Sequence, residues 1–254
     1  MPIISGIDYP VIYNGGKLLI EGWNGVDKIH SIDRITNGSE QRYDINTQLR
    51  AGYGQASGIF KDLVGNNDGA VINCGWGDDS LSFNGIDSVV EYAGAITNRY
   101  TLSGIFAIEH VLSLNQPRFI DGNNTTYPGF YLENHSSGAP RNQWKYSVWA
   151  QNLDQAFPQG NTAPNNKRVH IAYCYDGTKI MLYINGIYAD FINTTRNPAS
   201  RTYNWLGGSI ASKGGYANRF MKGEICCFER FSRALAPREI AINAVLDMDE
   251  YKII

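Results

Sequence analysis

The sequence predicts an all-β protein, a two-sheet antiparallel sandwich with one short C-terminal helix. Short stretches of alternating apolar and polar residues follow one another along most of the 254-residue chain, at intervals of about ten residues and with turn residues between them. Two stretches are broken by Asn-Gly, at Asn84-Gly85 and Asn185-Gly186, the dipeptide that most readily supplies the positive φ angles of a tight hairpin. The 27 Gly and 16 Tyr also favour strands joined by tight turns over helical packing.

The first 52 residues predict a small β-rich segment that is separate from the main domain. Its candidate strands are short and are divided by Gly- and Asn-containing turns; they cover residues 11–13, 17–21, 28–35 and 42–45. Sheets this small are marginal without a partner surface. We therefore expect residues 1–52 to dock on the main domain or on another subunit, and residues 53–254 to form the sandwich.

The main domain begins with an Asp followed by a Gly- and Asn-rich turn, over residues 61–69. Candidate strands then follow in series, at residues 70–74, 80–84, 88–92, 100–112, 118–121, 129–133, 145–151, 167–175, 179–185, 187–192, 204–210 and 221–231. The alternation is clean in several of them; Val169, Ile171 and Tyr173, for example, share one face of their strand. Such a series is typical of a sandwich.

One helix is predicted from Pro237 to about residue 249. Proline suits the first turn of a helix, and an apolar stripe at helical spacing follows it, at Ile240, Ala244, Val245 and Met248. The last turn is acidic, which the helix dipole disfavours. We therefore expect the helix to dock through its stripe and to fray beyond Met248.

Four motifs follow one another along the chain in the order found in a known family. They are the Asn-Gly hairpins, the run Arg-Val-His-Ile-Ala-Tyr-Cys-Tyr-Asp-Gly at residues 168–177, the run Phe-Met-Lys-Gly-Glu-Ile at 220–225, and the run Phe-Ser-Arg-Ala-Leu-Ala-Pro-Arg-Glu-Ile at 231–240. Over residues 58–251 the chain resembles the laminin-G-like family of concanavalin A-like sandwiches. The resemblance implies a jelly roll with one concave sheet, in a family whose members mostly bind glycans or proteins and are frequent on bacteria and bacteriophages. It also implies a packing role for His170 and a close passage of strands at Gly223.

The composition excludes several classes of partner. The 22 basic and 24 acidic residues give a net charge of −2, and no Lys/Arg cluster prepares a surface for nucleic acid or for an anionic membrane. No run approaches the roughly 20 apolar residues of a membrane-spanning helix. Cys74, Cys174, Cys226 and Cys227 lack metal-ligand spacing, and the adjacent pair should point to opposite faces of its strand, so we expect buried reduced thiols.

The spacing of the acidic residues indicates whether the protein could be a glycosidase. A retaining glycosidase needs two carboxyl groups about 5 Å apart. The nearest candidates, Glu224 and Glu229, are five positions apart and should face opposite sides of their strand. A Gly-x-Ser-x-Gly elbow is absent, and the four His show no metal-binding spacing. We expect the protein not to be an enzyme.

Binding candidates come from one loop and one aromatic strand. In the loop, Asp121, Asn123, Asn124 and Tyr127 combine polar groups for sugar hydroxyls with an aromatic ring, and Asp121 and Asn123 could also supply oxygen ligands for Ca²⁺, which some members of the resembled family bind. A solvated turn is the simpler interpretation of the same loop.

The aromatic strand over residues 144–149 places Trp144, Tyr146 and Val148 on one face and Trp149 on the other. One set should belong to the core. The other set should be a ligand platform or a subunit contact, so both Trp144 and Trp149 are candidates for ligand binding. We interpret Trp205, in a later strand, as a core residue.

These observations predict a non-catalytic adhesion or structural module that binds glycans or neighbouring proteins. The first residues lack a basic region and an apolar stretch, so we expect no secretory signal. A bacteriophage virion component (tail, fibre or capsid-surface protein), assembled in the host cytoplasm, is the setting we favour. A free or bacterial cell-surface lectin is the first alternative, and a glycoside hydrolase is the least favoured. Glycan sites of this type are weak, at about millimolar affinity, so we expect a homo-oligomer that gains avidity.

Overall fold

The computed structural model describes residues 11–14, 17–20, 22–24, 27–29, 45–51, 58–93, 99–111, 116–121, 129–134, 144–150, 153–157, 162–194, 203–208 and 219–253. The chain divides into two compact units, Met1–Tyr43 and Asp44–Ile254. In the first unit, β1 (Val11–Asn14) pairs with β2 (Lys17–Ile20), and β3 (Gly22–Asn24) pairs with β4 (Asp27–Ile29). Both pairs are antiparallel.

The second unit is a sandwich of two antiparallel sheets. Sheet I has the strand order β18-β17-β16-β11-β20-β9-β8, with β5 also paired to β20. Its strands are β5 (Ile45–Arg50), β8 (Gly75–Trp76), β9 (Leu81–Asn84), β11 (Tyr100–Ile108), β16 (Val169–Tyr175), β17 (Lys179–Ile184), β18 (Ile187–Asn193) and β20 (Lys222–Phe231).

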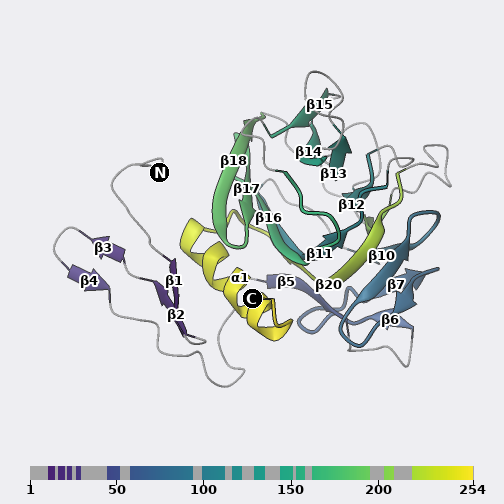
Figure 1. Ribbon diagram of the computed structural model, residues 1–254, viewed down its shortest axis with the longest axis horizontal. Helices are drawn as coiled ribbons and strands as arrows, with labels where there is room; N and C mark the ends of the chain where they lie inside the picture. Colours follow the sequence, from purple (N-terminus) through teal and green to yellow (C-terminus); the bar gives the residue numbers. More distant parts are fainter. Residues whose placement is uncertain are drawn as a thin grey trace. The chain divides into compact units, whose positions relative to one another are not determined.

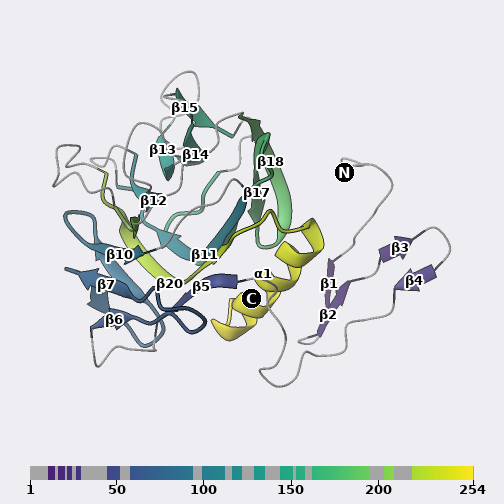
Figure 2. The ribbon, with the colours of Figure 1, turned by 180° about the vertical axis from the view of Figure 1, so that it is seen from behind.

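Sheet II has the order β15-β14-β13-β12-β19-β10-β7-β6. Its strands are β6 (Ile59–Phe60), β7 (Gly69–Ile72), β10 (Val89–Ala93), β12 (Arg118–Asp121), β13 (Phe130–Asn134), β14 (Trp144–Ala150), β15 (Leu153–Ala156) and β19 (Tyr203–Leu206). Figures 1 and 2 show the two layers from opposite sides. The two-sheet antiparallel sandwich with one helix, predicted from the sequence, is confirmed.

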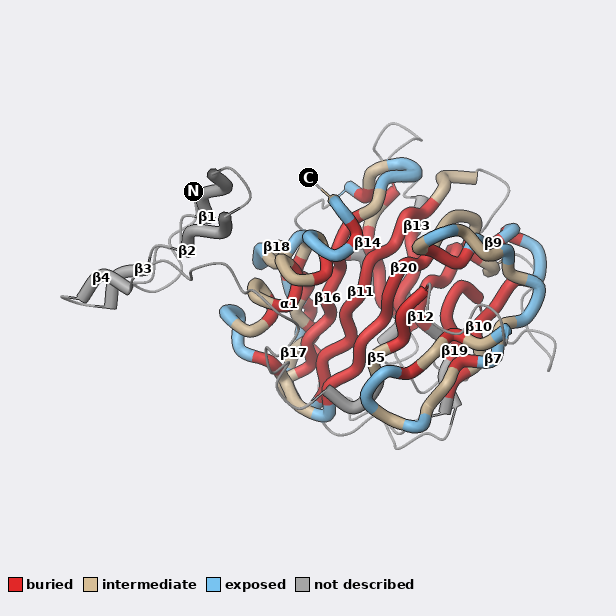
Figure 3. Tube along the Cα trace, turned by 90° about the horizontal axis from the view of Figure 1, so that it is seen from below, coloured by how far each residue is buried: buried red, intermediate tan, exposed pale blue. Residues whose placement is uncertain are grey.

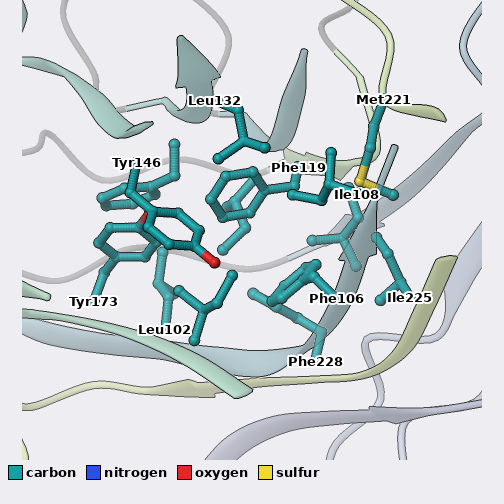
Figure 4. Close-up of a cluster of buried hydrophobic side chains, with 14 of the residues drawn as sticks. Leu102, Phe106, Ile108, Phe119, Leu132, Tyr146, Tyr173, Met221, Ile225 and Phe228 are labelled. Atoms are coloured by element: carbon teal, nitrogen blue, oxygen red, sulfur yellow. The ribbon is translucent and has the colours of Figure 1, made fainter. Parts of the chain in front are cut away.

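The core lies between the sheets and is rich in aromatic rings. Phe130 of sheet II stacks on Tyr173 of sheet I with ring centroids 3.8 Å apart, and Phe119 lies 5.2 Å from Phe106. Figure 3 shows the long central strands buried along their length, and Figure 4 shows side chains from both sheets meeting in this layer. Alternation explains the packing, because every second residue of each strand turns inward.

Two glycines of sheet I allow close strand contact. Gly223 has φ +143, and a Cβ there would collide with the carbonyl oxygen of Ala107 in β11. A Cβ on Gly104 would collide with the carbonyl oxygen of Cys227 in β20. The close passage expected at Gly223 is confirmed, and side chains are excluded where β11 and β20 meet.

The boundary between the units lies earlier than residue 52. Strand β5, which we assigned to the N-terminal segment, pairs antiparallel with β20 from Cys227 to Phe231. It occupies the part of the β20 edge that β9 leaves open, because β9 pairs only with Lys222 to Ile225. The docking role of the preceding residues stays a prediction.

Helix α1 (Pro237–Glu250) covers the outer face of sheet I, in contact with β11, β16 and β18 (Figure 1). It begins at Pro237 as predicted, and the Ala236 backbone N–H donates to Glu239 Oε2 at 2.8 Å. Its buried face consists of Ile240, Asn243, Ala244 and Asp247, so the predicted stripe is only partly right.

The expected fraying beyond Met248 is wrong. The helix continues to Glu250, where the Tyr251 N–H donates to the Asp247 carbonyl at 3.0 Å. Arg50 of β5 lies 2.8 Å from Asp247 Oδ1 and 3.4 Å from Glu250 Oε2. This cation compensates the acidic last turn, which the helix dipole alone would disfavour.

All four cysteines are free, and Cys174, Cys226 and Cys227 are buried. The expected opposite orientation of Cys226 and Cys227 is wrong, because both pack in one cluster with Ile105 and Tyr251. A register shift in the β11–β20 pairing gives β20 one extra residue there, which interrupts the strict alternation. Among the described residues, no helix has the length and apolar character needed to span a membrane.

Candidate functional site

The outer face of sheet II, which points away from the core, holds the candidate site. The described helix packs on sheet I, in contact with β11, β16 and β18. Arg118 and Asp121 of β12 would normally face opposite sides because they are three positions apart. A register shift between Arg118 and Ile120 breaks the alternation, so that Arg118 pairs with Tyr131 and Asp121 pairs with Trp205.

One row of this face runs across three strands through Trp205. Trp205 of β19 is in register with Glu91 of β10 on one side and with Asp121 of β12 on the other. Neighbouring strands are about 4.8 Å apart, so the Cα atoms of Glu91 and Asp121 are about 10 Å apart, with Trp205 between them. Trp205 is 4% exposed, while its neighbour Leu206 belongs to the core.

The indole N–H of Trp205 has no hydrogen-bond partner among the described residues. Buried polar groups are nearly always satisfied, and an unsatisfied donor costs about 1–3 kcal/mol. A hydroxyl or carbonyl oxygen from a bound molecule would satisfy this donor.

A second row crosses three strands at Arg118. Arg118 of β12 is in register with Tyr131 of β13, which is in register with Ser147 of β14. The Arg118 guanidinium carbon lies 5.5 Å from the centre of the Tyr131 ring, a cation–π arrangement. All three residues are buried, and the residues that flank Tyr131 and Ser147 in sequence point into the core.

The two rows together offer an aromatic donor, a ring–guanidinium pair, a hydroxyl and an acidic side chain on one sheet face. Sites for sugars combine polar groups of this kind with aromatic surface. The groups of this arrangement are of the kinds found in sites for polar, partly apolar ligands such as glycans.

The predicted loop site lies almost entirely outside the described residues. Asp121 is the last residue of β12, and its backbone is described; Asn123, Asn124 and Tyr127 lie beyond the described part of the chain. The described residues contain no cluster of three or more His, Cys, Asp or Glu that could hold a metal. The calcium site at Asp121 and Asn123 therefore stays a prediction.

In strand β14 the set of side chains that includes Trp144 belongs to the core. Trp144, Tyr146 and Val148 are buried in the core, and the Trp144 ring, 2% exposed, stacks on His110 with centroids 5.2 Å apart. This burial favours a packing role for Trp144. The Trp149 backbone is in register with Asp154, and its side chain lies outside the described part.

Sequence analysis did not single out Glu91, Arg118 or Tyr131, and it interpreted Trp205 as a core residue, which agrees with its burial. None of them lies in a recognisable motif, and they come together only across paired strands. The alternation of core residues could have indicated that each faces outward. Which residues stand side by side depends on the strand order and on the β12 register shift.

The two glutamates of β20 lie on the same face, which corrects the expectation of opposite faces. Glu229 is in register with Ser103 and Glu224 with Ala107, and the extra residue of β20 falls between them. Four positions of β11 separate their partners, which corresponds to about 13 Å. That distance is far beyond the roughly 5 Å of a retaining pair.

Both glutamates also have cationic partners. Glu224 Oε2 lies 3.0 Å from Arg168 Nη2, and the same guanidinium donates to both carboxylate oxygens of Asp79 at 2.7 Å. The Arg168 hydrogen bond lowers the pKa of the Asp79 carboxyl. These contacts engage the carboxylates of Asp79 and Glu224 with the Arg168 guanidinium.

A buried ion network lies between the outer face of sheet I and helix α1. Arg50, 1% exposed, donates to Glu229 at 2.5 Å and to Asp247 at 2.8 Å, and both carboxylates are fully buried. Burial alone would lower the pKa of Arg50, but the attraction of Asp247 and other neighbours raises it above its ordinary value. His170 is also fully buried, with Nε2 3.4 Å from Asp247 Oδ2, which supports a packing role.

Comparison with known families gives one match. A family model, Laminin_G_3, described as the concanavalin A-like lectin/glucanases superfamily, matches residues 60–241. The laminin-G-like resemblance drawn from the motifs is confirmed. A search of the curated proteins finds no match.

Solved structures share the fold at low sequence identity. Domain 4 of AbnA, an extracellular GH43 arabinanase from Geobacillus stearothermophilus in complex with arabinotriose, is 14% identical with a TM-score of 0.57, covering 79% of this chain and 98% of that chain. Trypanosoma rangeli sialidase in complex with sialic acid is 14% identical with a TM-score of 0.59, covering 82% of this chain and 33% of that chain.

A native heptameric SAP-like pentraxin from Limulus polyphemus is 12% identical with a TM-score of 0.52, covering 65% of this chain and 81% of that chain. The matched region thus spans only a third of the sialidase but nearly the whole arabinanase domain. At these identities the likeness shows a shared fold.

Proposed function

The chain belongs to the concanavalin A-like lectin/glucanase superfamily, and from this premise we propose that it is a non-catalytic module that binds glycans on the outer face of sheet II. The observation that carries the proposal is Trp205, which is 4% exposed and whose indole N–H has no hydrogen-bond partner in the described part of the chain. It stands in register with Glu91 and with the backbone of Asp121. The arabinanase domain of the same fold, whose structure contains arabinotriose, supports the proposal.

Binding to a dense glycan array tests this function. Trp205→Phe keeps an aromatic ring and removes only the N–H, so it should weaken binding about two- to tenfold, the value of one hydrogen bond. Trp76→Phe is the matched control, because Trp76 is half-buried in β8 of the other sheet and should change nothing. Equal binding by both variants would place the site elsewhere, and a wild-type protein that binds no glycan would refute the function.

In biological terms we propose a bacteriophage virion component, such as a tail, fibre or capsid-surface protein, that holds glycans or neighbouring virion proteins. Surface modules of this kind are frequent in the family that the sequence resembles. A free or bacterial cell-surface lectin is the alternative. Mass spectrometry of purified virions tests this setting. If the chain is not detected in them, the virion setting is rejected and the lectin alternative stands.

Weak sites on a single module would need several copies to act together, so we also propose a homo-oligomer. The heptameric SAP-like pentraxin, which shares the fold, supports this proposal. The mass of the native assembly by light scattering tests the oligomer. Calcium binding through the loop of Asp121 and Asn123 is tested by the same array with and without chelator.

A glycoside hydrolase is the second candidate function, and one observation favours it. Glu91 and Asp121 are in register on either side of Trp205, so the sheet places two acidic residues in one row, with Cα atoms about 10 Å apart. Reducing-sugar release that Glu91→Gln abolishes would establish this activity. Glu224→Gln is the control, because Glu224 is bound to Arg168 on the other sheet.

A further inference from the structure

Edge strand β18 exposes three large apolar side chains, of which Tyr188 and Phe191 carry rings and Ile187 is in register with Ile184, which packs against the inner core. Ile187 is 61% exposed, Tyr188 36% and Phe191 41%. The strand lies at the end of sheet I, so one of its sides has no partner strand among the described elements. Contiguous exposed apolar patches, when large, mark contact surfaces.

A strand irregularity puts both rings on the same face. Tyr188 is in register with Tyr183, and Phe191 is in register with Met181. Met181 and Tyr183 both pack in the cluster beneath α1, so their partners also lie on the outer face of sheet I. Tyr188 and Phe191 are three positions apart and would normally face opposite sides. The register shift between Leu182 and Tyr183 removes that difference.

The two rings are held in place and have polar neighbours. Tyr188 meets Tyr183 edge to face, with centroids 5.7 Å apart, and the Lys179 ammonium lies 5.6 Å from the centre of the Phe191 ring. Lys179 is in register with the exposed Asn193. Along β17, two positions separate the partners of the rings, which corresponds to about 7 Å. The strip therefore offers two rings in line, followed by an ammonium and an amide.

Strand addition at this edge is obstructed. The backbone N–H of Phe191 donates to Asp190 Oδ1 at 2.7 Å, and the Asp190 side chain is 4% exposed. An incoming strand would have to displace this buried carboxylate, and the irregular register would also oppose regular pairing. The edge thus disfavours extension of the sheet by a second copy and leaves the rings as the available surface.

We propose that Tyr188, Phe191 and Lys179 form a second glycan-binding surface, for an extended oligosaccharide that lies along β18. Rings contact the apolar faces of successive sugars, and the Lys179 ammonium and the Asn193 amide donate to sugar hydroxyls. The proposal rests on the glycan-binding function above, but it uses a different sheet and different residues.

Titration of the intact protein with linear oligosaccharides of increasing length tests the surface. Phe191→Leu and Tyr188→Leu keep apolar side chains and remove the rings, so each should weaken binding about two- to tenfold. The loss should be greater for longer chains, which reach both rings. Ile187→Ser is the matched control on the same strand and should leave binding unchanged.

The outcomes separate the two sites. Loss in Phe191→Leu with unchanged binding in Trp205→Phe supports this surface alone, and losses in both support two sites. Wild-type affinity in both leucine variants overturns the β18 surface without affecting sheet II. A wild-type protein that binds no oligosaccharide overturns both proposals. Self-association that Phe191→Lys abolishes, without any glycan binding, would instead make the strip a contact between copies.

Discussion

Replacing Arg50 by Met should destabilise the sandwich strongly, because it leaves two buried carboxylates without their cation. Arg50 is 1% exposed and lies 2.5 Å from Glu229 and 2.8 Å from Asp247, both fully buried. Met keeps most of the side-chain volume, so the change removes charge and hydrogen bonds more than packing. Breaking a buried ion pair by removing one partner costs about 3–5 kcal/mol.

Urea unfolding measures this loss. With a slope of about 2–3 kcal/mol per molar urea, the midpoint should fall by about 1–2 M without a change in slope. A triple variant, Arg50→Met with Glu229→Gln and Asp247→Asn, should recover part of the loss, because it removes the uncompensated charges.

Arg233→Met is the matched control. Its partner is Glu239 at 2.6 Å, but these side chains are 34% and 25% exposed. Solvent screens such a pair, and the loss should stay at or below about 1 kcal/mol. A midpoint of Arg50→Met within the error of the wild type, or equal to that of Arg233→Met, would refute the assignment of the network as a major contributor to stability.

Three further predictions follow from the same packing. A chain of residues 44–254 should unfold cooperatively in urea. A chain of residues 53–254, which lacks β5, should be less stable or less soluble. Equal urea midpoints for the two chains would contradict the role of β5. Gly223→Ala should destabilise the protein by about 1–3 kcal/mol or more in the same assay, because the added Cβ meets the Ala107 carbonyl and φ is +143; a neutral effect would exclude that collision. Burial raises the pKa of the Cys226 thiol to about 12, so its contribution is complete below the ordinary thiol pKa of about 8.5 and is lost as pH rises toward 12. The unfolding free energy should therefore fall with pH above about 9, and the fall should be shallower in Cys226→Ala.

The sequence predicted features that depend on local chemistry. Alternation located most strands, as in Val169, Ile171 and Tyr173, whose inward faces are all buried. Asn185 and Gly186 both have positive φ angles, 50° and 77°, as an Asn-Gly hairpin requires. Pro237 marked the start of the helix, because proline is tolerated in the first turn of a helix but not in its interior.

The failed predictions of strand faces share one cause, which is that a single extra residue changes the face of every residue beyond it. Glu224 and Glu229, and Cys226 and Cys227, were assigned by strict alternation, and the register shift in β20 reversed both results. The helix end at Met248 failed because its compensating charge, Arg50, comes from a strand almost 200 positions away.

The amino-acid sequence by itself determined the β class, the hairpins and the start of the helix, since these follow from residue periodicity and turn chemistry over a few positions; its motifs indicated the family by resemblance. Only the tertiary structure decided which strands are neighbours, where their registers shift, and therefore that Trp205 stands beside Glu91 and that Tyr188 and Phe191 share a face. The physical reason is that cross-strand neighbours are set by pairing across long loops, where each register competes with others that differ by one residue. Local patterns do not encode that choice.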